Sequence, residues 1–341
     1  MQKTSKSRLN VVSLFAAVAM LVLGTAKPVR ADTWTAAIGA QSPDKGKQAL
    51  AFLANELWIH AGDSIRWTAV TDELHTVSFL RTGQNRPPLL SAGTGGTFVG
   101  CPGATLDGSS FDGFTCVTSS PLTNGQTYTV KFPTAGNYKL VCLVHIRMTG
   151  AVHVLPTSQG LPHEQAFYDR EAVIQRAELL SDASGLEGRG IATAQRGSAN
   201  DVTVGIAAIS ATGGGSSTAA VQRFLGAMAV VRVGDTVEWT SLAPAVFHTI
   251  TFGTEPANAA PPFPLTLPID SDGVRHEVIS SPNESVNSGF VGSPTQEAVG
   301  APLLPLDFTR FRVTFTAPGT FNYICALHDD LGMKGTIIVH Q

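Results

Sequence analysis

Apolar and polar residues alternate in several short segments of the chain, as at Ile65 and Trp67 and across residues 128–132. Clusters of Gly, Pro and Asp separate these segments. Alternation with a period of two places every second side chain on the same face of a strand, and frequent turn signals favour antiparallel strands. The pattern predicts an all-β chain built from small β-sandwiches, with alternate side chains in the core.

One segment predicts a helix instead. Residues 161–182 have Pro162 near their start, and proline suits the first turn of a helix. Phe167, Ile174 and Ala177 fall on one face of this helix. The glycine-rich stretch that follows should end it; that stretch contains Gly185, Gly188 and Gly190. We expect the helix to pack against a sandwich, and a spacer between domains is the alternative.

The chain contains an internal repeat. Residues 59–67 align without gaps with residues 231–239, and a His-Thr-(Val/Ile)-(Ser/Thr)-Phe block follows each of them, beginning at His75 and at His248. A length of 341 residues fits about two domains. We therefore predict a signal peptide at 1–31, a first domain at 32–156 (the first half), a helical linker at 157–190 and a second domain at 191–341 (the second half).

The N-terminus has the pattern of a secretory signal peptide. Basic residues precede an apolar stretch at 11–23, and small residues follow it. Cleavage after Ala31 is preferred to cleavage after Ala26. The apolar stretch is shorter than the ~20 residues that a bilayer span needs, so an uncleaved anchor is the less favoured alternative. We expect a periplasmic or secreted protein.

Composition and charge limit the classes of partner that we expect. Hydrophobic residues make up 43% of the chain and charged residues 14%, which is enough apolar material for a large core. The formal net charge is -3, and there is no basic run that would neutralise a phosphate backbone. Nucleic acid is therefore not an expected partner, and no later segment is apolar enough to predict a membrane span.

The four cysteines occur in two kinds of neighbourhood. Cys101 and Cys116 lie in a stretch rich in Gly and Ser, which predicts a loop closed by a disulfide in an oxidising compartment. Two free thiols are the alternative. Cys142 and Cys325 each follow a hydrophobic strand and have a His three residues later.

These last two cysteines belong to repeated sets of possible metal ligands. In each half Cys, His and Met recur within one short loop, and a second His comes from a distant strand. A thiolate, two imidazoles and a thioether suit copper, because soft sulfur stabilises Cu(I) while imidazole also binds Cu(II). Zinc is one alternative, although a thioether is a poor zinc ligand. A structural Cys and structural His residues without a metal are the other.

With these motifs the chain resembles the cupredoxins, the family of plastocyanin, amicyanin and azurin, over most of both halves. The resemblance implies two Greek-key β-sandwiches joined by the helical linker, two type 1 copper ions per chain and electron transport. The loop of the first half is similar to that of amicyanins, and the longer loop of the second half is similar to that of plastocyanins. The ligands implied are His75, Cys142, His145 and Met148 in the first half and His248, Cys325, His328 and Met333 in the second.

The sequence departs from the family next to the upstream histidines. The family often has Asn at this position, where its side chain ties the two ligand-bearing segments together. This chain has Thr76 and Thr249. A hydroxyl can support the site in a similar way.

Paired cupredoxin domains also occur in copper nitrite reductases and multicopper oxidases, which add a copper bound only by His. Five histidines remain outside the two ligand sets: His60, His153, His163, His276 and His340. They form no His-x-His pair, and no His adjoins either ligand Cys. We therefore expect an electron carrier and not an enzyme. A catalytic copper between subunits and copper delivery or storage are the alternatives.

The resemblance further implies that electrons enter and leave beside His145 and His328, with both imidazoles near the surface. Apolar neighbours of these histidines would then form docking patches for redox partner proteins. These neighbours are Leu143, Val144, Ile146, Ala326, Leu327 and Leu331.

Overall fold

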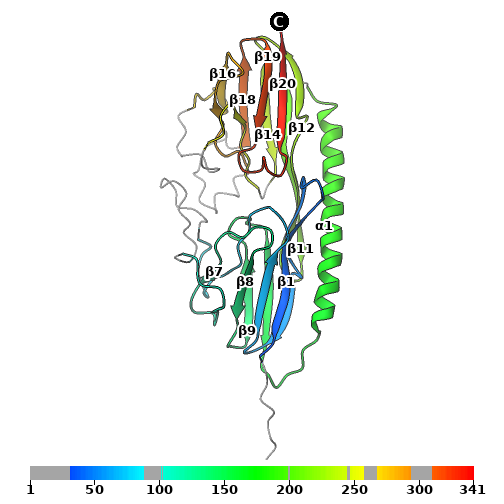
Figure 1. Ribbon diagram of the computed structural model, residues 1–341, viewed down its shortest axis with the longest axis vertical. Coiled ribbons are helices and arrows are strands. Elements are labelled where there is room, and N and C mark those ends of the chain that lie inside the picture. Colours follow the sequence, from blue (N-terminus) through cyan, green and yellow to red (C-terminus); the bar gives the residue numbers. More distant parts are fainter. Residues whose placement is uncertain are drawn as a thin grey trace, which may run out of the picture. The chain divides into compact units, whose positions relative to one another are not determined.

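The computed structural model describes residues 31–87, 101, 103–198, 200–243, 246–256, 267–292 and 309–341. Residues 1–30 of the expected signal peptide lie outside this set. The described chain consists of short strands and one long helix (Figure 1). None of the described helical residues forms a segment long and apolar enough to cross a membrane.

The described part of the first half is a β-sandwich. Its strands are β1 (Thr33–Gln41), β2 (Lys47–Leu53), β3 (Glu56–His60), β4 (Ser64–Ala69), β5 (Ser78–Phe79), β6 (Ser109–Ser110), β7 (Val117–Thr118), β8 (Thr127–Lys131), β9 (Gly136–Val141) and β10 (Thr149–Leu155). One group of strands has the order β2-β1-β4-β8-β6, and β3-β10-β9-β5-β7 forms the other. They enclose a core that contains Trp67, Phe79 and Phe132.

The second half repeats this arrangement. Its strands are β11 (Asp201–Thr212), β12 (Gly215–Leu225), β13 (Met228–Arg232), β14 (Thr236–Leu242), β15 (Thr251–Phe252), β16 (Arg275–Ile279), β17 (Val286–Asn287), β18 (Arg310–Phe315), β19 (Gly319–Ile324) and β20 (Lys334–His340). The parallel pairs β1–β4 and β3–β10 of the first half recur as β11–β14 and β13–β20. The prediction of two β-sandwiches is confirmed.

The two halves also pair with each other directly. β2 and β12 are antiparallel neighbours, with partners from Leu50↔Thr218 to Lys47↔Val221. This pairing joins strands of both halves into one continuous sheet. Ala243 and Val246 of the second half belong to the core cluster of the first. The halves are therefore connected by backbone hydrogen bonds and by packing, as well as by the helix.

The helix α1 runs from Gln165 to Ala194. The expectation that the glycine-rich stretch ends it is wrong, because all three glycines lie inside the helix. Of the expected apolar face, Phe167 packs against the core of the first half, whereas Ile174 is 49% exposed and Ala177 is exposed as well. The buried positions come later along the helix, and among them Leu179, Ala183 and Leu186 pack into a cluster with residues of β2 and β12.

Gly190 shows why a glycine is found within this helix. A side-chain carbon built at Gly190 would lie 2.2 Å from a methyl carbon of Leu225, on β12. The missing side chain lets the helix approach the strand closely. The expected packing role of the helix is confirmed, because it covers the strands that join the two halves.

Replacing Leu186 by Ala should lower the free energy of unfolding by about 2–5 kcal/mol, because Leu186 is 6% exposed against this cluster. Urea denaturation measures the loss. Ile174→Ala on the same helix is the matched control and should change stability by no more than about 0.5 kcal/mol. Equal losses in the two variants would contradict the packing described above.

Candidate metal centres

The first centre brings together two candidate ligands from one loop and a third from a distant segment of the first half. The sulfur of Cys142, at the end of β9, lies 3.9 Å from Nδ1 of His75 and 3.9 Å from Nδ1 of His145. The two Nδ1 atoms are 3.2 Å apart. All three side chains are buried, at 0–2% exposure. Met148 is fully buried and belongs to the same core cluster as Cys142.

The second centre repeats this geometry. The sulfur of Cys325 lies 3.9 Å from Nδ1 of His248 and 3.4 Å from Nδ1 of His328. Met333 is buried in the same core cluster as Cys325. Among the described residues, these two Cys-His-His groups are the only clusters of His, Cys, Asp or Glu that could hold a metal ion.

Backbone hydrogen bonds close both ligand loops. The N–H of Cys142 donates to the carbonyl of Met148, and the N–H of Met148 donates to the carbonyl of His145, each at 3.0 Å. Cys325 and Met333 are linked in the same way, also at 3.0 Å. The second loop therefore closes on the same pair of positions although it is two residues longer.

Thr76 and Thr249 hold the upstream histidine segments against the cysteine loops. The N–H of Thr76 donates to the sulfur of Cys142 at 3.4 Å, and its hydroxyl accepts the N–H of Leu143 at 2.7 Å. In the second half, Thr249 makes the matching bonds to Cys325 at 3.3 Å and to Ala326 at 2.8 Å. The hydroxyl thus ties the two segments together, as expected where the family often has Asn.

Two glycines leave room for the upstream histidine rings. Gly39 and Gly205 have φ angles of +67° and +65°, a backbone region that favours glycine. A side-chain carbon at Gly39 would lie 2.7 Å from Nε2 of His75, and one at Gly205 would lie 2.4 Å from Nε2 of His248. This repeated pair was missed in the sequence, although both glycines lie in the first strand of their half.

The electrostatics of both centres favour the thiolate that a metal needs. Burial acts to raise the pKa of Cys325, but the charge of His328 and hydrogen bonds from both histidines outweigh it and lower the pKa to about 5. Burial likewise opposes ionisation of Cys142, whose pKa is nevertheless held well below its usual range by His145 and His75.

Glu73 is a site residue that sequence reasoning missed. It is 5% exposed, and its carboxylate lies 3.5 Å from Nε2 of His145 and 3.3 Å from Nε2 of His328. Burial acts to raise the pKa of Glu73, but the charge of His328 and hydrogen bonds from both histidines lower it well below the usual value. Comparison of the two repeats could have identified it, because corresponding positions differ. Glu73 stands two residues before His75, and Val246 stands two before His248.

The expectation that the imidazoles of His145 and His328 approach the surface is wrong. They are 2% and 4% exposed, because each turns its Nε2 toward Glu73 and is covered where the halves meet. Three of the expected docking residues are buried as well: Leu143, Ala326 and Leu331. The other three are partly exposed: Val144, Ile146 and Leu327.

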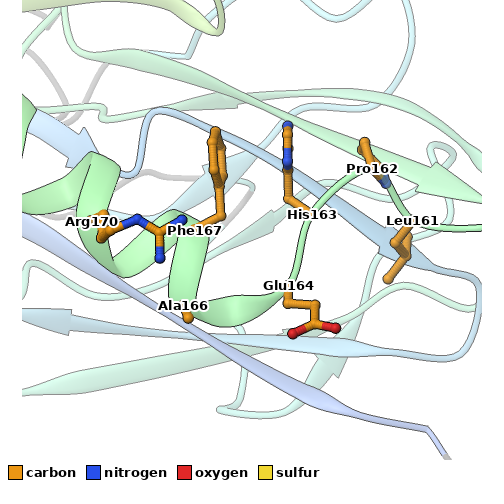
Figure 2. A pocket seen from close by; sticks show the side chains of 7 residues that line it. All are labelled: Leu161, Pro162, His163, Glu164, Ala166, Phe167 and Arg170. Carbon is orange, nitrogen blue, oxygen red and sulfur yellow. The ribbon is translucent and has the colours of Figure 1, made fainter.

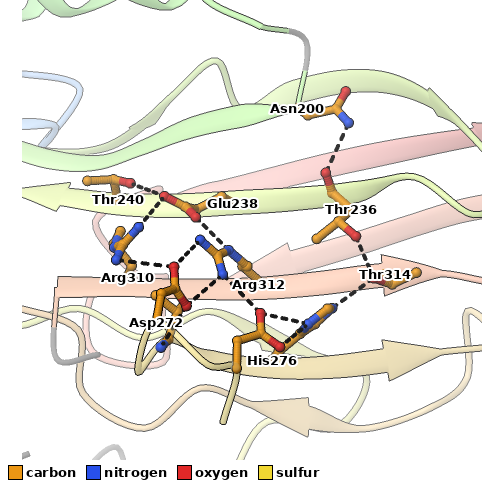
Figure 3. Close-up of polar contacts among 11 residues, drawn as sticks. Asn200, Thr236, Glu238, Thr240, Asp272, His276, Arg310, Arg312 and Thr314 are labelled. Atoms are coloured by element: carbon orange, nitrogen blue, oxygen red, sulfur yellow. Dashed lines mark hydrogen bonds and ion pairs between the residues drawn. The ribbon is translucent and has the colours of Figure 1, made fainter. Parts of the chain in front are cut away.

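Four of the remaining histidines have structural contacts. His60 contacts the carbonyl of Gln159 at 2.7 Å, and His153 contacts Glu56 at 2.7 Å. His276 joins a polar network around Arg312 on the outside of the second half (Figure 3). His163 stacks on Phe167, and both line a hollow at the start of α1 (Figure 2).

Cys101 and Cys116 form the expected disulfide. Cys142 and Cys325 remain free and buried within their centres. The donor set of each centre, a cysteine sulfur facing two imidazole nitrogens with a methionine in the same core, fits copper.

Thr76→Val should destabilise the metal-free protein by about 1–3 kcal/mol, because it leaves the buried N–H of Leu143 without its acceptor. Thr76→Ser keeps the hydroxyl and is the matched control. Chemical denaturation followed by fluorescence compares the two. A loss as large in the Ser variant would assign the effect to the missing methyl group.

One family model matches part of the first half. The model of copper-binding proteins of the plastocyanin/azurin family matches residues 40–155, which include the whole first ligand set. Among solved structures, the chain is similar to amicyanin from Paracoccus versutus (Thiobacillus versutus), with 21% identity over 38% of this chain and 86% of that chain and a TM-score of 0.24. A reduced amicyanin variant gives 18% identity over 36% and 82%, with a TM-score of 0.23. No curated protein matches. Residues 40–155 are therefore similar to the plastocyanin/azurin family of copper-binding proteins, the cupredoxins.

Proposed function

We propose that the chain is an exported electron-transfer protein with two type 1 copper centres, one in each half. The observation that carries the proposal is the repeated convergence of one cysteine sulfur and two histidine Nδ1 atoms at buried positions. Bound there, copper would supply a one-electron couple. His75, Cys142, His145 and Met148 would hold the first ion, and the second set is His248, Cys325, His328 and Met333.

The residues around each centre favour a rigid site. The backbone bonds between Cys142 and Met148 and the clamp made by Thr76 fix the ligand loop before any ion is present. Complete burial keeps water away from the sulfur. A site whose ligands move little between two oxidation states suits a carrier, because little reorganisation opposes electron transfer.

The same burial favours a carrier over copper delivery, which needs ligands that a partner can reach. An enzyme of the nitrite reductase or multicopper oxidase type would need a further copper bound by histidines alone. Four of the remaining histidines already have protein contacts in the described chain, as given above.

The leader pattern at the N-terminus supports export to the periplasm or beyond the cell. We further propose that redox partner proteins dock on the partly exposed apolar side chains beside the two ligand loops, at Val144, Ile146 and Leu327. Such small patches suit weak and rapidly released partners.

The oxidised, copper-loaded protein should have an intense blue thiolate-to-copper absorption and about two coppers per chain. Cys142→Ser and Cys325→Ser should each remove about half of the absorption and one copper, because each removes the only thiolate of one centre. Absorption spectroscopy with metal analysis checks this. A single variant that loses both contributions, or neither, would refute two independent centres.

Replacing Met148 or Met333 by Gln should lower the potential of one centre while copper stays bound, because an amide oxygen favours Cu(II) more than a thioether does. Redox titration followed by absorption measures the shift. Met228→Gln is the control, since Met228 is 73% exposed and lies outside both centres. An unchanged potential would mean that the methionine is not an axial ligand.

A further inference from the structure

A single buried carboxylate contacts both candidate centres. Oε1 of Glu73 lies 3.5 Å from Nε2 of His145, and Oε2 lies 3.3 Å from Nε2 of His328. In both rings Nδ1 faces the cysteine of its own centre. Each imidazole therefore directs one nitrogen to its cysteine and the other to the same carboxylate.

Residues of both halves hold Glu73 in this place. Its N–H donates to the hydroxyl of Thr71 at 3.1 Å, and that hydroxyl donates to Gln48 at 2.6 Å. The side-chain amide of Gln222 donates to Oε2 at 3.4 Å. Gln48 and Gln222 are fully buried and lie on β2 and β12, the two strands that join the halves.

The contacts of Glu73 are those of a buried anion between two donors. An isolated carboxylate in a protein interior is very unfavourable unless it is paired and hydrogen-bonded. The carboxylate of Glu73 has one histidine nitrogen on each oxygen and Gln222 on one of them. An Nε2–H on each ring can donate to this carboxylate, while Nδ1 faces the cysteine of its own centre, where a bound metal would take the place of the Nδ1 proton.

We propose that Glu73 is a shared positioning residue for both copper centres, accepting an Nε2–H hydrogen bond from His145 and from His328 and thereby linking the two ligand sets. This inference rests on the proposed function. A carboxylate that accepts the second ring N–H of a metal-ligating histidine fixes the ring orientation and makes the ligand more basic. Here one carboxylate does so for two histidines.

A shared carboxylate makes the two centres interdependent. Its negative charge stabilises the more positive, oxidised state of each centre. When the hydrogen bond from one histidine strengthens, the carboxylate becomes a weaker acceptor for the hydrogen bond from the other histidine. Oxidation of one centre therefore makes oxidation of the other less favourable, and by linkage the effect is reciprocal.

The experiment compares Glu73→Gln with the native chain in the copper-loaded protein. The variant keeps the shape of the side chain and removes its charge. Both potentials should rise by at least about 59 mV. For a one-electron couple this lowers the ratio of oxidised to reduced centre about tenfold at a fixed potential. Each centre is titrated alone in the Cys325→Ser or the Cys142→Ser background.

Asp72→Asn is the matched control. It removes the same charge from the neighbouring residue, whose side chain is 22% exposed and paired with Lys45. Neither potential should move in this variant. If Glu73→Gln shifts only one potential or neither, the shared role is refuted. A native protein without blue absorption would instead refute the proposed function itself.

A second measurement needs no variant at Glu73. In the reduced, copper-loaded native protein, proton NMR should show two slowly exchanging imidazole Nε2–H signals, from His145 and His328. Rapid exchange of either proton with solvent would overturn the inference, because a ring open to water is not bonded to a buried carboxylate.

Discussion

The antiparallel pairing of β2 with β12 is the contact on which the other features of the site depend. It joins the two halves through backbone hydrogen bonds, and the two strands carry Gln48, which accepts from Thr71, and Gln222, which donates to Glu73. Because the halves are joined here, the imidazoles of His145 and His328 face a protein interior and not solvent. Two sandwiches connected by the helix alone would leave these rings free to contact water.

Burial on this scale is tolerated only because charges are paired. A thiolate surrounded by apolar core is unfavourable, and each centre offsets this cost with two imidazoles and a backbone N–H aimed at the sulfur. Glu73 continues the same pattern, since its carboxylate faces the other edges of His145 and His328. The polar groups of the two centres therefore form one connected set, in which a change at one group alters its neighbours.

Local patterns in the sequence predicted the sandwiches, the repeat, the disulfide and the convergence of Cys142 and Cys325 with their histidines. These features depend on spacing and order within one half. The predicted end of the helix was wrong because Gly190 allows a close contact with Leu225, a residue distant in the sequence. The prediction that His145 lies at the surface was wrong for the same kind of reason, because its burial depends on the other half of the chain. Contacts between halves leave no periodic signal in either one.

Glu73 is an asymmetric feature of a duplicated chain, at the place where its halves meet. Its counterpart Val246 is buried in the core cluster of the first half. A second carboxylate there would place another negative charge in a buried region, where like charges repel strongly. One acidic residue is sufficient because its two oxygens face opposite histidines. The repeat therefore accounts for two similar candidate metal centres, and a departure from the repeat accounts for the residue that contacts both.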